Sequence, residues 1–407
     1  MMYNIFISLY SLGVHIAALF NKKVSTMMNG ENEAFDILKR KIDRNAKYIW
    51  FHAASLGEFE QGRPLIEEIR KKYPSYKILQ TFFSPSGYEV RKDYKGADIV
   101  CYLPLDTKGN VKHFLDLANP CMAFFVKYEF WKNYLAELQS RNIPVYSVCS
   151  IFRKEQIFFK WYGRSYRNVL KTFTHLFVQN AESVDLLSGI GVNQTSIVGD
   201  TRFDRVVEIK NQSKELDLVR IFKGNAMVLV AGSSWAPDED IFIPYFNSHP
   251  EIKLIIAPHV ISESHLGEIM GKLKRKAVRY TQADEKSIES AECLIIDCYG
   301  LLSSIYRYGE ISYVGGGFGV SIHNTLEAAV YGIPVIFGPN NKKFMEAQAL
   351  KQNGAGFEIH GKDDFDRLMD RFLTDNNSLN IASKKADEYV TSNVGALDKI
   401  MSIVKFK

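Results

Sequence analysis

Short apolar runs alternate with amphipathic stretches along almost the whole chain. The apolar runs have the length of strands, and their near-continuous hydrophobicity is typical of strands buried on both faces of a parallel sheet. The stretches between them repeat apolar residues at helical spacing. Because the alternation occurs in both halves of the chain, it predicts an α/β fold with a parallel sheet in each half.

The predicted elements of the first half end near residue 206. Helices are expected between several of the strands, for example at residues 60–72, 108–117 and 131–141. Strands are expected at residues 48–54, 77–83, 99–103, 122–126, 144–148, 175–179 and 195–198.

A polar, charged segment at residues 204–224 contains no predicted strand and is expected to connect the two halves. The alternation then starts again, and after residue 357 only helical patterns remain. Strands are expected at residues 227–231, 253–257, 293–297, 311–314 and 334–337, and helices at residues 237–247, 262–274, 323–331 and 344–352.

The chain of 407 residues is too long for one ordinary core, so two doubly wound domains facing a cleft are the simplest architecture. The expected domains span residues 22–206 and 225–390, joined by a linker at residues 207–224. The first 21 residues are expected to form a membrane-associated helix. The last helix, residues 391–407, is expected to pack back on the first domain.

Composition narrows the functional classes. With 46% hydrophobic and 24% charged residues the protein is globular, and a net charge of +5 suits anionic substrates or an acidic lipid surface. No nucleic-acid-binding motif or basic block with interleaved aromatic residues is present. The five cysteines are an odd number without a Cys-x-x-Cys pair or a zinc-type spacing, which indicates free thiols in a reducing compartment and no bound metal.

The first twenty residues carry no charged side chain unless His15 is protonated, and Lys22 and Lys23 follow them. A helix of that length spans about 30 Å, the thickness of a bilayer core. Polar residues within it make an interfacial helix an equally serious interpretation. The basic flank would keep the following domains in the cytoplasm, so we expect the protein at the cytoplasmic side of a membrane.

The most informative stretch is YIWFHAASLGEFEQGRPLIEEIR, residues 48–70. A buried strand ends in a turn from Ser55 to Gly57, and an amphipathic helix follows at once, so Glu58 lies beyond the carboxyl end of a strand. Ligands bind at that edge of open α/β sheets. A carboxylate there could act as a general base, although it could also only complement the helix dipole.

A glycine-rich loop is the clearest ligand signal of the second half. In ISYVGGGFGVSIHNTLEAAVYGIPVIFGP, residues 311–339, a strand runs into the loop and a helix begins near His323. Such a loop lets the backbone approach a phosphate, and Glu327 could accept hydrogen bonds from ribose hydroxyl groups. A dinucleotide fingerprint lacks its third glycine here, and no P-loop occurs. A mononucleotide or nucleotide sugar fits better, and a purely structural turn is the alternative.

Two further strand ends repeat this logic. In AGSSWAPDED, residues 231–240, hydroxyl and backbone donors precede Trp235, which could cover a ring or a sugar. In IIAPHV, residues 255–260, His259 follows a strand, although it could be an ordinary loop histidine. In the first half, Glu129 and Arg202 also follow strands. A guanidinium suits a phosphate or a sugar carboxylate, but either residue could be a surface charge or a salt-bridge partner.

Taken together, these stretches resemble the 3-deoxy-D-manno-octulosonic acid (Kdo) transferases of lipopolysaccharide synthesis. The resemblance runs from about Tyr48 to about Leu350 and depends on the order and spacing of several motifs. These motifs are HAASLGEF at 52–59, TFFSPSG at 81–87, KYEFW at 127–131, VGDTRFD at 198–204, AGSSW at 231–235, and the segment from GGG to HNTLE at 315–327.

The resemblance implies a GT-B glycosyltransferase with two Rossmann-like domains. It implies CMP-Kdo as the donor, bound by the C-terminal domain, and a tetraacylated lipid A precursor (lipid IVA) as the acceptor, bound by the N-terminal domain. It also implies inversion at the anomeric carbon without a metal and without a cofactor. The alternatives are a GT-B enzyme that uses a UDP-sugar, a UDP-sugar epimerase, and a non-catalytic nucleotide- or lipid-binding protein of the same fold.

The resemblance also implies roles for individual residues. Glu58 matches the catalytic base, Glu129 a second functional carboxylate, and Arg202 a cation near the leaving phosphate. Ser55 and Gly57 are assigned to the acceptor. The donor-binding residues are expected to be Ser234, Trp235, Pro258, His259, Tyr299, Gly300, Leu301, Gly316, Gly317, Asn324, Thr325, Leu326 and Glu327.

Three positions depart from the family pattern. His259 stands where many members have Arg, so a permanent positive charge is missing there. Thr325 replaces a Pro, which should alter loop stiffness more than chemistry, and Arg202 replaces a Lys and keeps the charge. None of the three removes the expected base.

Overall fold

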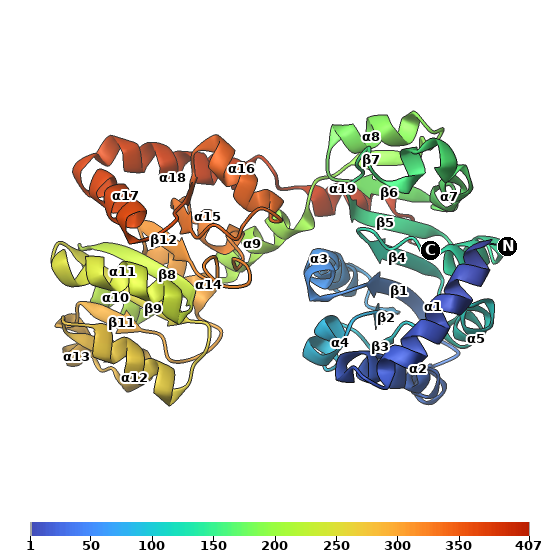
Figure 1. Cartoon of the computed structure of the whole chain (residues 1–407), viewed down its shortest axis with the longest axis horizontal. Helices are drawn as coiled ribbons and strands as arrows, with labels where there is room; N and C mark the ends of the chain where they lie inside the picture. Colours follow the sequence, from blue (N-terminus) through green and yellow to red (C-terminus); the bar gives the residue numbers. More distant parts are fainter. Residues whose placement is uncertain (1, 407) are drawn as a thin grey trace. The chain divides into compact units, whose positions relative to one another are not determined.

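The computed structural model describes residues 2–406, with the side chains of Met2, Lys23 and Ser165 left out of the description. The chain divides into two compact units. Unit 1 comprises Met1–Asp204 together with Val394–Lys407, and unit 2 comprises Arg205–Asn393 (Figure 1). Each unit contains a seven-stranded sheet in which the paired strands run parallel, so the predicted α/β class is confirmed.

The sheet of unit 1 has the order β3-β2-β1-β4-β5-β6-β7. Its strands are β1 (Lys47–Ala53), β2 (Tyr76–Phe82), β3 (Ile99–Tyr102), β4 (Met122–Val126), β5 (Val145–Ser150), β6 (His175–Val178) and β7 (Thr195–Ile197). Its helices are α1 (Met2–Ala18), α2 (Lys22–Lys41), α3 (Leu56–Lys72), α4 (Pro85–Arg91), α5 (Lys108–Ala118), α6 (Lys132–Ser140), α7 (Arg164–Leu170), α8 (Ala181–Ser188) and α19 (Ala396–Ile403), with short 3-10 turns η1 (Ile157–Phe159) and η2 (Trp161–Gly163).

Strand β1 shows why the strands of this sheet are nearly continuous apolar runs in the sequence. Successive side chains of a strand point to opposite faces of the sheet. Tyr48 and Trp50 belong to the core cluster on one face, and Ile49, Phe51 and Ala53 belong to the cluster on the other. Both faces are covered by helices, so both sets of positions are mostly apolar.

Helix α19 completes the second of these cores. Ala396, Ile400 and Val404 are buried among side chains of the central strands and α3. The backbone N–H of Gly395 donates to Asp204 Oδ1 at 2.7 Å, and the ring of Phe406 stacks on Tyr73 with centroids 4.2 Å apart. The end of the chain is therefore part of the fold of unit 1.

The sheet of unit 2 has the order β10-β11-β9-β8-β12-β13-β14. Its strands are β8 (Met227–Ser234), β9 (Ile252–Pro258), β10 (Ala277–Arg279), β11 (Cys293–Ile295), β12 (Ile311–Val314), β13 (Val335–Phe337) and β14 (Gly356–Glu358). Its helices are α10 (Asp217–Lys223), α11 (Ala236–Ser248), α12 (Glu263–Lys272), α13 (Glu285–Glu289), α14 (Leu302–Ile305), α15 (Leu326–Ala329), α16 (Met345–Asn353), α17 (Lys362–Thr374) and α18 (Asn376–Thr391), with 3-10 turns η3 (Tyr280–Gln282) and η4 (Tyr306–Tyr308).

The segment expected to be a linker, residues 207–224, is largely helical. Helix α9 (Thr201–Gln212) begins in unit 1 and ends in unit 2, and α10 follows it within unit 2. Val219 and Phe222 are completely buried, which anchors α10 to the second core despite the charged surroundings in the sequence. This connecting segment therefore contains no strand, as expected, and its second helix belongs to unit 2.

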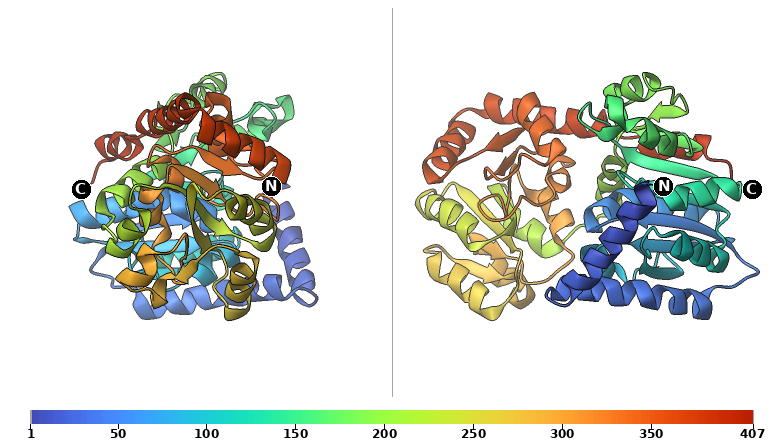
Figure 2. Two further views of the ribbon diagram at one scale, coloured as in Figure 1. Left: turned by 90° about the vertical axis from the view of Figure 1, so that its left-hand side faces the viewer. Right: turned by 45° about the vertical axis from the view of Figure 1, so that its right-hand side comes forward.

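Helix α1 lies along the outside of unit 1 (Figure 2). Its Ile7 and Val14 are buried, whereas most of its other apolar residues are exposed. Residues 19–21 separate α1 from α2. Among the residues that the structure describes, no helix has both the length and the apolar character needed to cross a bilayer.

Candidate functional site

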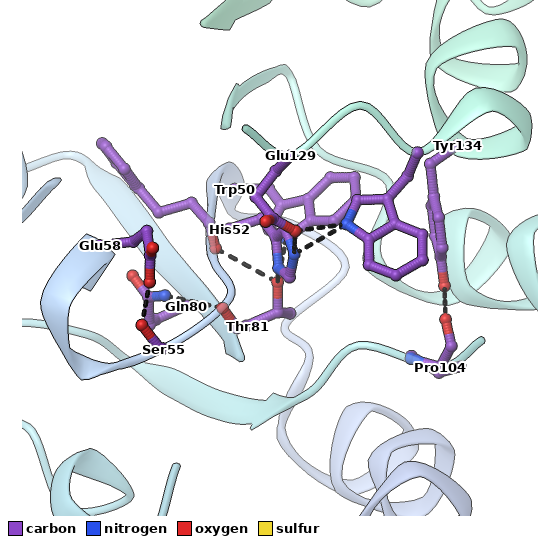
Figure 3. Close-up of polar contacts among 11 residues, drawn as sticks. Trp50, His52, Ser55, Glu58, Gln80, Thr81, Pro104, Glu129 and Tyr134 are labelled. Atoms are coloured by element: carbon purple, nitrogen blue, oxygen red, sulfur yellow. Dashed lines mark hydrogen bonds and ion pairs between the residues drawn. The ribbon is translucent and has the colours of Figure 1, made fainter. Parts of the chain in front are cut away.

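Two carboxylates of unit 1 follow neighbouring strands of the sheet. Glu58 lies just after β1 and Glu129 just after β4, and β1 pairs with β4. The carboxyl ends of parallel strands lie at one edge of the sheet, the edge where open α/β sheets bind ligands. Figure 3 shows Glu129 in a network with His52, Thr81 and Trp50, and the Ser55–Glu58 pair outside that network.

Glu58 occupies the first turn of α3. Ser55 is the N-cap residue of this helix, and its hydroxyl donates to Glu58 Oε2 (Figure 3). The negative charge lies next to the unpaired N–H groups of the helix start, which stabilise it. The side chain is half-buried, and none of the described residues donates to its other oxygen, Oε1. Glu58 therefore complements the helix dipole and still keeps one oxygen for a ligand.

Glu129 is held from one side by two ring N–H groups. His52 Nε2 lies 3.0 Å and Trp131 Nε1 lies 2.6 Å from Glu129 Oε2. Only 12% of the Glu129 side chain is exposed, so the interpretation as a surface charge is wrong. Its Oε1 has no hydrogen-bond donor among the described residues. A polar ligand group at this edge could therefore reach it.

The support for Glu129 comes from a fully buried histidine that the sequence analysis did not single out. His52 belongs to β1, and its Nδ1 lies 2.9 Å from the hydroxyl of Thr81 on β2. Trp50 Nε1 donates to the same hydroxyl at 2.8 Å. With its hydrogen on Nε2, His52 donates to Glu129 and can accept the Thr81 hydroxyl hydrogen at Nδ1. The sequence signal that could have identified His52 was a histidine inside an otherwise apolar strand.

Arg202 lies in the first turn of α9, and its guanidinium contacts Asp200. The Nε and Nη2 atoms lie 3.1 and 2.9 Å from Asp200 Oδ2. The same oxygen accepts from Gln61 Nε2 at 2.8 Å. Asp200 is almost fully buried, so the arginine is fixed at this position instead of extending freely into solvent. A role at a phosphate stays a prediction.

In unit 2, three of the aromatic side chains at the carboxyl edge of the sheet form a stack. The ring of His259, which follows β9, lies between Trp235, at 4.7 Å, and His323, at 4.4 Å between centroids. Trp235 Nε1 also donates to His323 Nε2 at 3.2 Å. Burial, together with the neighbouring His259, lowers the pKa of His323 to about 4. The imidazole is therefore neutral at physiological pH and can accept this hydrogen bond.

A buried aspartate connects the stack to the glycine-rich loop. Asp238 Oδ2 accepts from the backbone N–H of Trp235 and of Gly316, both at 2.9 Å. Its Oδ1 accepts from the Tyr313 hydroxyl at 2.8 Å. Burial raises the pKa of the Asp238 carboxyl group. Sequence reasoning missed this residue, because Asp238 looks like an ordinary first-turn acid of α11.

The glycine-rich loop is packed against backbone on both sides. A Cβ atom on Gly315 would lie 2.3 Å from the Ser233 carbonyl oxygen, and one on Gly317 would lie 2.6 Å from the Cα of Gly338. Gly316 has a φ of 89°, a conformation that L side chains rarely adopt. Ser233, with a φ of 54°, is strained at the adjoining end of β8. The loop conformation therefore requires glycine.

The remaining predicted donor residues differ in their surroundings. Asn324 Nδ2 donates to Glu327 Oε1 at 3.0 Å, so these two side chains lie together at the start of α15. Thr325 is fully buried, and its hydroxyl lacks a hydrogen-bond partner among the described residues. Tyr299 is 76% exposed, and it precedes Gly300 and Leu301 in an irregular segment before α14. The structure brings several of the predicted donor residues together around His323: Ser234, Trp235, Pro258, His259 and Gly316. The role of Tyr299 stays a prediction.

Comparisons with known proteins show a similarity to one family. Residues 30–205 match the family described as "3-Deoxy-D-manno-octulosonic-acid transferase (kdotransferase)". The chain is 26% identical over 365 residues to the 3-deoxy-D-manno-octulosonic acid transferase of Aquifex aeolicus, covering 87% of this chain and 95% of that protein. It is 24% identical over 373 residues to the enzyme of the same name from Haemophilus influenzae, covering 88% and 86%.

Solved structures support the fold assignment. The UDP-GlcNAc 2-epimerase of Neisseria meningitidis bound to UDP-GlcNAc is similar with a TM-score of 0.57 at 12% identity, covering 87% of this chain and 98% of that one. A putative UDP-N-acetylglucosamine 2-epimerase from Listeria monocytogenes gives 0.55 at 13% identity, covering 88% and 95%. At such identities the similarity concerns the GT-B-like fold alone. By sequence, the chain is similar to Kdo transferases over most of its length.

Proposed function

We propose that the protein transfers Kdo from CMP-Kdo to a lipid A precursor, lipid IVA, by a single inverting displacement that needs no metal. The observation that carries this proposal is Glu58: a carboxylate at a helix N-terminus, beyond a parallel strand, with Oε1 unbonded by the described residues. The sequence similarity to Kdo transferases supports Kdo as the sugar that is transferred. The aromatic stack of unit 2 supports a nucleotide donor.

In this reaction Glu58 acts as the general base. Its free oxygen takes the proton of the acceptor hydroxyl while the hydroxyl oxygen forms a bond to the anomeric carbon. The bond between that carbon and the phosphate oxygen of CMP breaks, and the electron pair leaves with CMP. Attack on the face opposite the leaving group inverts the anomeric centre. Arg202 and the N–H groups of the glycine-rich loop stabilise the charge of the departing phosphate.

Glu129 is assigned to positioning. Its Oε2 is already engaged by His52 and Trp131, so the carboxylate is fixed in one orientation. We assign its free Oε1 to a hydroxyl group of the acceptor sugar. Ser55 and Gly57, at the start of the same helix as Glu58, are assigned to the acceptor as well.

The proposal includes a membrane surface at the cytoplasmic side of the inner membrane. Acyl chains of a lipid acceptor stay in the bilayer, so the enzyme must work beside it. The outer face of α1 supports such an attachment: Ile5, Leu9, Leu12 and Ile16 recur at helical spacing and are 55%, 63%, 58% and 54% exposed. Phe6, Leu19 and Phe20 extend the same apolar surface.

The experiment is a transfer assay with purified protein, CMP-Kdo and lipid IVA, followed by mass analysis of the lipid. Loss of general-base catalysis costs roughly 10²- to 10⁴-fold in rate, so Glu58→Gln should lower turnover by that amount. Its affinity for CMP-Kdo should stay within about twofold, because a neutral amide changes no donor contact. Glu68→Gln, on the same helix and paired with Lys72, is the matched control and should transfer normally.

Each alternative gives a different result in this assay. A UDP-sugar transferase would be inhibited by UDP and not by CMP. An epimerase would convert the nucleotide sugar without any acceptor. A non-catalytic protein would bind the nucleotide without releasing CMP. Normal turnover by Glu58→Gln would contradict the assignment of the base even where transfer itself is observed.

A further inference from the structure

The carboxyl edge of the unit 2 sheet extends beyond the residues assigned to the donor. In the strand order β9-β8-β12-β13-β14, the assigned residues follow the first three strands: His259 after β9, Trp235 after β8, and the glycine-rich loop after β12. The next two strands, β13 and β14, end in segments that line a pocket of about 500 Å³. This pocket therefore lies next along the same edge, within one unit.

The pocket combines hydrogen-bonding groups, a short apolar wall and positive charge. Lys342 and Lys343 follow β13 in its wall, and Ser321 and Asn340 contribute neutral polar groups. The rest of the lining is formed by Val320, Pro339, Phe344, Glu358 and His360. A space of this size with hydroxyl, amide and ammonium groups suits a polar, negatively charged ligand.

The two lysines carry charge that no neighbour compensates. Neither Lys342 nor Lys343 makes an ion pair with any other residue in the described part of the chain. The one carboxylate of the lining, Glu358, is already engaged by Lys351, by Asn341 Nδ2 at 2.7 Å and by His360 Nε2 at 3.2 Å. The pocket therefore keeps an excess of positive charge, which attracts an anion.

The glycine-rich loop adjoins both this pocket and the aromatic stack. A Cβ atom on Gly316 would lie 2.4 Å from the carbonyl oxygen of Ser321, which lines the pocket, and 3.0 Å from the ring of His323, which belongs to the stack. Asn340 is tied to the same loop, because its backbone N–H donates to the Gly317 carbonyl at 3.0 Å and its Nδ2 to the Gly319 carbonyl at 2.6 Å. A single ligand could contact both sites.

We propose that this pocket binds the sugar of the donor, with Lys342 and Lys343 holding its carboxylate. The inference rests on the proposed function, because it takes the donor to be a nucleotide linked to an acidic sugar. The aromatic stack would hold the nucleoside, the glycine-rich loop the phosphate, and the pocket the octulosonic acid with its carboxylate and hydroxyl groups. The two lysines would then distinguish this donor from a nucleotide that carries a neutral sugar.

The test compares two ligands on one variant without any acceptor. Binding of CMP-Kdo and of CMP is measured by calorimetry for the wild type and for the double variant Lys342→Gln/Lys343→Gln. Hydrogen bonds to a charged group contribute about 1.5–3 kcal/mol each, so CMP-Kdo should bind roughly 10- to 100-fold more weakly to the variant. CMP lacks the carboxylate and should bind within about twofold of the wild-type affinity.

A double variant of the same charge change serves as control. Lys274→Gln/Lys384→Gln removes two exposed lysines of unit 2 that lie outside the pocket, and it should bind both ligands normally. Circular dichroism should be the same for all three proteins.

Two outcomes would overturn this inference and leave the proposed function unaffected. If CMP and CMP-Kdo lose affinity equally, the lysines contact the phosphate, and if neither changes, the pocket holds no part of the donor. A wild-type protein that binds neither ligand would overturn the inference and the proposed function together. Normal wild-type binding with an unchanged lysine variant leaves the proposed function intact.

Discussion

Glu58 and Glu129 follow neighbouring strands, but their surroundings suit them to different tasks. Glu129 is held in one orientation by ring N–H groups of His52 and Trp131. Among the described side chains, the Ser55 hydroxyl alone donates to Glu58, which lies at the helix N-terminus. The fixed orientation of Glu129 suits a group that positions a ligand. This difference supports the proposed assignment of Glu58 as the base and Glu129 as the positioning group.

A third buried carboxylate of unit 1 makes stability depend on pH. Glu31, on α2, accepts from the backbone N–H of Leu105 at 3.1 Å, and its other oxygen has no partner among the described residues. Burial raises its pKa from 4.5 to about 7. Because the folded state binds this proton more tightly than the unfolded state, the stabilisation is complete below pH 4.5 and is lost as the pH rises through 7.

Glu31→Gln should therefore change the pH profile of unfolding. This pKa shift of Glu31 corresponds to at most about 3 kcal/mol in the free energy of unfolding. The variant should therefore be about 1–3 kcal/mol more stable than the wild type at pH 8. The advantage should vanish near pH 4.5. Urea unfolding of unit 1 across this range measures it. Glu33→Gln, at an exposed position of the same helix, should show no such trend, and equal profiles for all three proteins would contradict the interpretation.

At the residue scale, the sequence identified the side chains that follow strands but not those that support them. Glu58, Glu129 and Trp235 could be located because a strand end is a local pattern. His52 and Thr81 could not be paired in advance, because their contact depends on β1 lying beside β2. Strand order is a property of the whole sheet, and hydrophobic periodicity carries no information about it.

At the element scale, burial explains the success of the longest strands. The strands β1, β2, β8 and β9 were located to within a few residues because both of their faces are buried. The edge strands β10 and β14 are partly exposed and were missed, although β7, β11 and β13 are equally short and were predicted. The helix expected at residues 323–331 is only α15, Leu326–Ala329, because the residues before it belong to the glycine-rich loop.

The exposed face of α1 leads to a prediction about membrane binding. Burying a leucine side chain stabilises association by about 1.5–3 kcal/mol, so Leu9→Glu/Leu12→Glu should weaken binding to anionic phospholipid vesicles at least roughly tenfold. Co-sedimentation with vesicles measures this. Both leucines are exposed, so the fold should tolerate the change.

The control for α1 is Ile381→Glu, at an exposed apolar position of α18 in the other unit. It should bind vesicles like the wild type. Equal binding by Leu9→Glu/Leu12→Glu and the wild type would show that α1 is not the attachment surface.

At the scale of the molecule, the chain enters and leaves unit 2 once each, and unit 1 is built from both ends of the sequence. Helix α9 carries the chain out of unit 1, and it returns after Asn393. The units have separate cores, with no core cluster among the described residues shared between them. A change to the C-terminal segment should therefore affect the stability of unit 1 and leave the core of unit 2 unchanged.

Truncation after Asn393 tests this organisation. It removes the buried side chains of Ala396, Ile400 and Val404 and the stacking of Phe406 on Tyr73. Since each large apolar side chain contributes about 1.5–3 kcal/mol, unit 1 should lose several kcal/mol, a large part of the roughly 5–15 kcal/mol that stabilises a domain. Limited proteolysis should then degrade unit 1 first and leave a fragment that begins near Arg205.

A point variant should destabilise unit 1 to an intermediate extent. Ile400→Ala leaves the helix in place and should cost about 2–5 kcal/mol, an effect between the wild type and the truncated protein. Because the proposed donor site lies within unit 2, CMP should bind the truncated protein with nearly wild-type affinity. Kdo transfer should be lost, because the proposed base, Glu58, lies in unit 1. If unit 1 of the truncated protein resisted proteolysis as well as unit 1 of the wild type, this result would contradict a structural role for the last helix. Loss of CMP binding would instead mean that the two cores are not independent.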